Sequence, residues 1–218
     1  MGAPDVRPLL RGHLHAGAAA AAAFGGTYLV AMSAADRPRQ LSMLVYGAGL
    51  TLLFSVSAAY HLRAWVPPRA RILRRLDHAS IFMLIAATYT PIAFNLLPGW
   101  WRVGILGVVW AVALAGAGVA VAGVQLPRWP RAGIYVAMGW LAVVALGQVG
   151  ATLPWSALAL LLAGGLIYTA GAVLYALRWP DPWPRIFGYH EVFHLLTILA
   201  AAAFYILIVA YVLPAPRP

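Results

Sequence analysis

Histidines at or near the ends of apolar stretches are the residues in this sequence best suited to chemistry. His190 and His194 are four residues apart, so their imidazoles lie on one face of a helix. Two imidazoles at this spacing can bind one metal ion at about 2.0–2.1 Å. His61 could supply a third ligand and leave one position for water, an arrangement typical of catalytic rather than structural zinc.

Two more polar residues are suited to work beside such a metal. A zinc-bound water can have a pKa near 7 and act as a nucleophile, and Asp77 could orient that water and take its proton. Ser57 precedes His61 by one helical turn, which favours a supporting role at the site. Ordinary polar packing between helices is the alternative for Ser57. The residues therefore predict zinc ligands at His61, His190 and His194, with Asp77 and Ser57 as the catalytic residues.

Four other ionisable residues nearby receive structural interpretations. Glu191 points away from the face of the histidine pair, and we expect a solvated carboxylate that suits the start of a helix. His78 lies off the face of the neighbouring aspartate, so we expect it to have no part in the site. His13 and His15 open the first apolar stretch, and we expect both at the membrane interface.

Seven apolar stretches must position these residues. The chain of 218 residues is 63% hydrophobic and 9% charged, whereas soluble domains carry about a quarter charged residues. A helix needs about 20 apolar residues to cross a bilayer. The sequence thus predicts an all-α, integral membrane bundle of seven transmembrane helices, forming a single domain over 1–218. The predicted spans are 13–33, 40–62, 77–97, 101–124, 132–150, 154–176 and 190–213.

The arginines predict the orientation of these spans. All 15 basic residues are Arg, and 11 of them fall in the N-terminal segment or in the loops after spans two, four and six. Because positive charge favours the cytoplasm, we expect a multi-pass protein of the inner (plasma) membrane, with its N-terminus cytoplasmic and its C-terminus outside. His61 then ends span two on the cytoplasmic side, where Asp77 opens span three and His190 opens span seven.

Several function classes are excluded or disfavoured. The net charge of +10 could suggest nucleic acid, but the arginines lie mostly in short loops between apolar stretches, so we expect membrane lipids as partners and no nucleic acid. Cys is absent, which excludes disulfides and thiolate metal ligands. The sequence also lacks a GxSxG elbow and a phosphate-binding loop ending in Lys. The histidine group is the only catalytic candidate.

Three stretches resemble the hemolysin III family, the bacterial branch of the progestin and adipoQ receptor proteins. They are Ser57-Ala58-Ala59-Tyr60-His61, then Leu76-Asp77-His78-Ala79-Ser80-Ile81-Phe82 continuing through Thr88-Tyr89-Thr90-Pro91, and Gly188-Tyr189-His190-Glu191-Val192-Phe193-His194. The pattern of SxxxH, an Asp and HxxxH is also similar to that of alkaline ceramidases. The resemblance implies seven helices with a cytoplasmic N-terminus. It also implies zinc on His61, His190 and His194, with Asp77 near the bound water and Ser57 close by.

Three functions remain open at this point. The leading hypothesis is a zinc-dependent membrane hydrolase that acts on a lipid amide or ester. The second is a non-enzymatic membrane sensor or cytolytic, hemolysin-type protein in which zinc is structural. A transporter ranks last, because no series of polar residues continues the site across the membrane.

Overall fold

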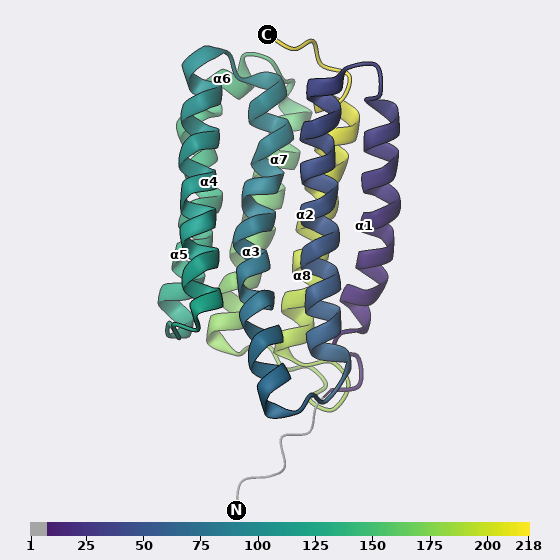
Figure 1. Cartoon of the computed structure of the whole chain (residues 1–218), viewed down its shortest axis with the longest axis vertical. Coiled ribbons are helices and arrows are strands. Elements are labelled where there is room, and N and C mark those ends of the chain that lie inside the picture. Colours follow the sequence, from purple (N-terminus) through teal and green to yellow (C-terminus); the bar gives the residue numbers. More distant parts are fainter. Residues whose placement is uncertain (1–7) are drawn as a thin grey trace, which may run out of the picture.

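The computed structural model describes residues 8–218 and confirms a bundle of membrane-spanning helices (Figure 1). Within these residues, 7 helices are long and apolar enough to cross a membrane. The helices are α1 (His13–Met32), α2 (Arg37–Leu62), α3 (Pro67–Leu96), α4 (Gly99–Ala122), α5 (Arg128–Trp140), α6 (Leu146–Gly150), α7 (Trp155–Leu177) and α8 (Tyr189–Leu207). A 3₁₀ turn, η1 (Leu141–Ala145), joins α5 to α6 in one span, and a π turn, η2 (Ile208–Val212), ends the last span.

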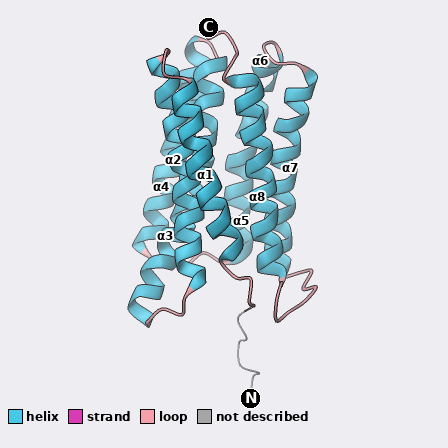
Figure 2. Ribbon diagram, turned by 90° about the vertical axis from the view of Figure 1, so that its right-hand side faces the viewer, coloured by secondary structure: helices cyan, strands magenta, loops and turns pink. Residues whose placement is uncertain are grey.

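The spans run alternately up and down in two layers. Helices α1 to α4 form one layer, and α5, α7 and α8 form the other (Figures 1 and 2). The starts of α1, α3, α5 and α8 and the ends of α2, α4 and α7 therefore share one end of the bundle, here called the proximal end. Most of the predicted arginine-rich segments lie at this end, and Arg7 lies outside the described residues.

Helix ends follow local sequence signals, with one clear difference from expectation. Helix α3 begins at Pro67, ten residues before the predicted start at residue 77. Pro67 and Pro68 occupy the first helical turn, where the missing N–H of proline costs no hydrogen bond. Hydropathy marked only the apolar part of this helix, and its arginine-bearing first turns extend beyond it. At α2, the Asp36 carboxylate accepts from Arg39 N at 3.2 Å and caps the helix.

A tyrosine from α3 supports the break in the fifth span. Where α5 becomes 3₁₀, the Tyr89 hydroxyl donates to Gly139 O at 2.6 Å and accepts from Ala142 N at 2.6 Å. A side chain thus satisfies backbone groups that the change of helix type frees, as a membrane interior requires. The break was not predicted, because its support comes from a residue some 50 positions away.

Close packing holds the layer that contains α1, α2 and α3. A Cβ on Gly26 of α1 would lie 2.9 Å from Gly47 Cα of α2, so only glycine allows this approach. The buried Asn95 amide of α3 donates to Ser42 Oγ of α2 at 3.0 Å. By contrast, the outward side chains are large and apolar, as Phe24 and Trp155 show. Such an exterior fits lipid rather than water.

Candidate metal centre

The structure brings the three predicted histidines together at the proximal end. His61 comes from the last turn of α2, and His190 and His194 come from the first two turns of α8. One ring nitrogen of each lies within 4.8 Å of the others. His61 Nε2 and His190 Nε2 are 3.2 Å apart. No sequence pattern joins residues 61 and 190 directly, so this contact is produced by the packing of α2 near α8.

The donor set and its spacing suit zinc. A tetrahedral ion with Zn–N bonds of about 2.0–2.1 Å separates its nitrogen ligands by about 3.3 Å, close to the 3.2 Å between His61 and His190. His194 Nδ1 is buried and has no hydrogen-bond partner among the described residues, which is costly for a polar atom unless another group satisfies it. Three neutral imidazoles without a thiolate are typical of a catalytic zinc site.

Asp77 and Ser57 both lie beside the histidines. Asp77 Oδ2, near the start of the apolar part of α3, is 3.7 Å from His61 Nε2, and its side chain is 16% exposed. Ser57 is buried one turn before His61 on α2. Both residues line the same cavity as His190 and His194. This placement agrees with the predicted arrangement, while their catalytic roles remain predictions.

The expectation of a solvated Glu191 is wrong. Its carboxylate is 0% exposed and accepts from Arg11 Nε at 2.8 Å. Its other oxygen accepts from Gly188 N at 2.8 Å, which caps the start of α8. The helix-start role was therefore expected correctly, but the carboxylate is buried because the segment before α1 covers it. Glu191 thereby fixes the turn of α8 that carries the histidine pair.

The expectation of an interfacial His15 is also wrong. His15 of α1 is 2% exposed, and its ring stacks on His194 with centroids 3.7 Å apart and an interplanar angle of 9°. The ring edge-packs on Phe54 at 5.0 Å. Neither ring nitrogen has a hydrogen-bond partner among the described residues. His13, two residues earlier, is exposed.

Sequence reasoning could have found His15. The start of α1 was assigned to the same membrane side as His61 and His190, and the depth argument that grouped those residues applies to it equally. Glu191 offered a weaker signal, since its partner Arg11 is 180 positions away. His78 does not join the three-histidine group, as expected, although it lines the cavity beside it.

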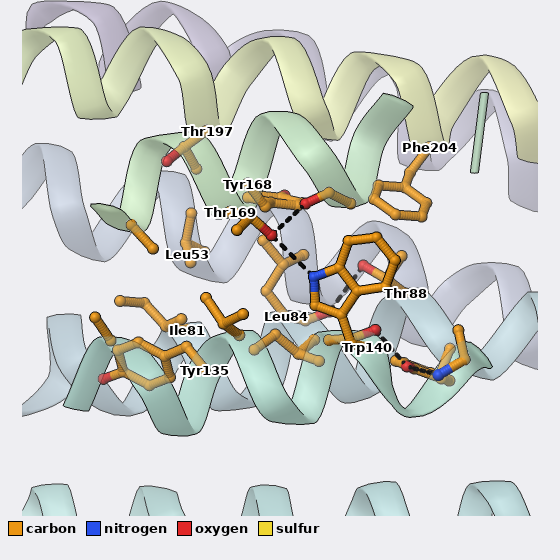
Figure 3. A pocket seen from close by; sticks show the side chains of 18 of the residues that line it. Leu53, Ile81, Leu84, Thr88, Tyr135, Trp140, Tyr168, Thr169, Thr197 and Phe204 are labelled. Atoms are coloured by element: carbon orange, nitrogen blue, oxygen red, sulfur yellow. Dashed lines mark hydrogen bonds between the residues drawn. The ribbon is translucent and has the colours of Figure 1, made fainter. Parts of the chain in front are cut away.

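An elongated cavity of about 210 Å³ extends from the histidines into the bundle. The proximal part is lined by the polar residues His15, Ser57, Asp77, His190 and His194, and by Arg128 and Arg131 from the start of α5. Farther in, the walls come from α2, α3, α5, α7 and α8 and are mainly apolar, as Leu53, Leu84 and Phe204 in Figure 3 show. Several polar side chains along this part form hydrogen bonds with neighbouring groups. Trp140 Nε1, for example, donates to Thr169 Oγ1 at 2.9 Å (Figure 3).

Sequence comparisons with known proteins place this chain in a family. The model of a family described as Haemolysin-III related matches residues 5–205. Hemolysin-3 of Bacillus cereus is 31% identical over 176 residues, covering 80% of this chain and 76% of the relative. Heptahelical transmembrane protein ADIPOR2 of Oryza sativa subsp. japonica is 33% identical over 186 residues, covering 75% and 78%.

A more distant animal protein shows similar coverage. Monocyte to macrophage differentiation factor of Homo sapiens is 26% identical over 203 residues, covering 88% of this chain and 79% of the relative. The family model covers nearly the whole chain and includes the segments that carry His61, Asp77, His190 and His194. With seven apolar helices and this match, the chain is a multi-pass membrane protein that belongs to the Haemolysin-III related family.

Proposed function

We propose that this protein is a zinc-dependent membrane hydrolase that acts on a lipid amide or ester. The observation that carries the proposal is the position of the three-histidine group. It lies with Asp77 at the polar end of a cavity whose inner part is apolar. A lipid has the same division, with a polar linkage next to an apolar chain.

Each residue has a distinct part in the proposed reaction. His61, His190 and His194 would hold zinc, which when bound supplies a Lewis acid and a water of lowered pKa. Asp77 would accept a proton at Oδ2, the oxygen that faces His61 at 3.7 Å. Ser57 would act as a hydrogen-bond donor beside the reacting carbonyl, because it lines the same cavity.

The cavity beyond these residues would hold the acyl chain. Side chains such as Leu53, Leu84 and Phe204 give it an apolar lining, which favours a hydrocarbon over water. Positioning of the chain would place the amide or ester at the polar end, next to the histidines and Asp77. Exclusion of bulk water from the inner part would also strengthen electrostatic interactions at that end.

Turnover by purified protein tests this proposal. Zinc-loaded protein in lipid nanodiscs would be incubated with N-acyl and O-acyl lipids, and fatty acid release would be measured. We expect release that stops after chelation and returns with added zinc. Leu44→Ala, on the exposed face of α2, is a matched control that should retain activity. Absence of release from all lipids by folded, zinc-loaded protein would contradict the proposal.

A second candidate function follows from the names of relatives. Two Bacillus relatives are a Hemolysin-3 and a Hemolysin-3 homolog, which favours a non-enzymatic, cytolytic protein with structural zinc. Asp77→Asn separates the two candidates. A hydrolase loses turnover and keeps zinc, whereas a structural site changes only in stability. Release of dye from liposomes, with and without chelator, would measure cytolysis directly.

We also propose that the proximal end faces the cytoplasm of the plasma membrane. The excess of arginine at this end supports the proposal. Because the chain has no cysteine, single cysteines at Gln125 and Pro216 can be labelled without background. In intact cells, a membrane-impermeant thiol reagent should label Pro216→Cys and not Gln125→Cys. The reverse pattern would overturn the orientation.

A further inference from the structure

A second cavity lies at the proximal end, between α3, α4 and α5. Its volume is about 460 Å³. Arg74 and Arg75 come from α3, and Arg131 comes from the first turn of α5. The α4–α5 loop, with Gly123 and Gln125, closes one side. This cavity is here called the arginine groove.

The arginine groove is strongly cationic. Its lining contains three arginines and no carboxylate. Within residues 8–218, the ion pairs formed by arginines involve Asp36 and Glu191, and none includes Arg74, Arg75 or Arg131. Three guanidinium groups that face one cavity without a counter-charge favour an anion, and the fork of guanidinium donors matches phosphate oxygens.

One of the three arginines is held in place by the backbone of α4. Arg75 Nη1 donates to Val121 O at 3.3 Å. The guanidinium lies over Gly123, where an added Cβ would come within 2.2 Å of Nη2. Gly123 has φ +86, so it ends α4 in a conformation that other residues rarely adopt. The glycine thus leaves room for the guanidinium. Because the bond to Val121 already holds the guanidinium in place, less conformational entropy is lost when it binds an anion.

The rest of the arginine groove is apolar and has room for a hydrocarbon chain. Its α4 wall carries small residues, Ala115, Gly116 and Ala120, together with the exposed side chains of Val112 and Val119. Phe82 of α3 lies against this wall, and a Cβ on Gly116 would come within 2.4 Å of its ring. The apolar wall runs along the membrane-facing part of α4, while the cations lie near the helix ends. A lipid lying along the helices would place its charged head group at the cations and its hydrocarbon chain against the apolar wall.

We propose that the arginine groove binds one anionic glycerophospholipid of the bilayer. Its phosphate contacts Arg74, Arg75 and Arg131, and an acyl chain packs along Val112 and Val119 of α4. Basic pockets between transmembrane helices bind lipid head groups in this way. The proposal does not depend on hydrolysis, because none of the three-histidine residues lines this cavity.

Native mass spectrometry of the detergent-purified protein tests the proposal with phosphatidylglycerol and phosphatidylcholine as probes. The wild type should retain one phosphatidylglycerol in preference to phosphatidylcholine. Arg74→Gln/Arg131→Gln should weaken phosphatidylglycerol binding about thirtyfold, from about 1 kcal/mol for each arginine at about 1.4 kcal/mol for each factor of ten. Ala120→Trp, which fills the apolar wall, should reduce binding of both lipids.

A matched control separates a site from general surface charge. Arg69→Gln/Arg71→Gln removes the same amount of charge from the proximal end, here from the start of α3 alone, and neither residue lines the arginine groove. This variant should bind phosphatidylglycerol as the wild type does. Equal loss of phosphatidylglycerol binding in both double variants would overturn the proposal. A wild type that binds phosphatidylglycerol no better than phosphatidylcholine would also overturn it. Zinc content, unchanged in every variant, would show that the histidine site remains intact.

Discussion

The metal centre and the arginine groove lie at the same end of the bundle and share a wall, yet they are built in opposite ways. His78, Arg131 and Tyr135 line both cavities. On one side of this wall, His61 and His194 are buried and Asp77 is the nearby carboxylate. On the other side, the half-buried Arg74 and Arg131 and the exposed Arg75 face an apolar wall without a carboxylate. Buried histidines beside a carboxylate suit a metal and chemistry, whereas arginines without a carboxylate suit reversible binding of an anion.

The largest expected difference between the two regions is in turnover. Asp77→Asn keeps the size of the side chain but removes the proton acceptor, so fatty acid release should fall about 10²–10⁴-fold. Arg74→Gln, across the shared wall, should leave turnover at the wild-type level. Steady-state kinetics of both variants at equal zinc content checks this. Full activity of Asp77→Asn would remove the carboxylate from the mechanism.

The next difference is in stability. Arg11→Ala leaves Glu191 buried without its partner, which should cost about 3 kcal/mol, the low end of the range because the Arg11 side chain is 23% exposed. The thermal midpoint should fall by about 6–12 °C, at about 2–4 °C for each kcal/mol. Arg74→Ala should cost under about 0.5 kcal/mol. If Arg11→Ala and Arg74→Ala lowered the thermal midpoint equally, burial of the Arg11–Glu191 pair would contribute nothing to stability.

A smaller effect, on zinc affinity, should show whether His15 acts through the stacking of its ring or through its ring nitrogens. Its ring stacks on His194, and such aromatic contacts contribute about 0.5–1.5 kcal/mol. His15→Ala should therefore weaken zinc binding up to about tenfold, while His15→Phe should restore most of the affinity by keeping the stack. Competition with a fluorescent zinc chelator measures both. Equally weakened zinc binding in the two variants would show that the ring nitrogens of His15, and not its stacking, support the site.

The smallest effect should come from the shared wall. The Tyr135 hydroxyl donates to His78 O at 3.1 Å and ties α5 to α3. Tyr135→Phe removes this hydrogen bond and should cost about 1 kcal/mol of stability. Zinc affinity and phosphatidylglycerol binding should both stay at wild-type values. A change in either one would show that the two regions are coupled through this contact.

The sequence predicted the spans and much of the site for identifiable reasons. Apolar runs alone located all seven membrane spans, and the i, i+4 spacing placed His190 and His194 on one face. Arginine counts grouped His61 and Asp77 with them at one end, and the structure places all four there.

Features that depend on distant contacts were not predicted. The stacking of His15 on His194 and the burial of Glu191 by Arg11 require the packing of α1 against α8. The 3₁₀ break in the fifth span depends on Tyr89 from another helix. The early start of α3 is different, since Pro67 marks it locally. The hydropathy pattern did not include this start because the turns that follow Pro67 carry arginine.

Zinc content per chain tests the central claim most directly. Protein purified without added metal or chelator would be measured by mass spectrometry of metals for the wild type, His194→Ala and the control His13→Ala, whose side chain is exposed. We expect about one zinc in the wild type and the control, as for a single site, and none in His194→Ala. Wild-type protein without zinc that also fails to bind it on addition would contradict a zinc centre at these histidines.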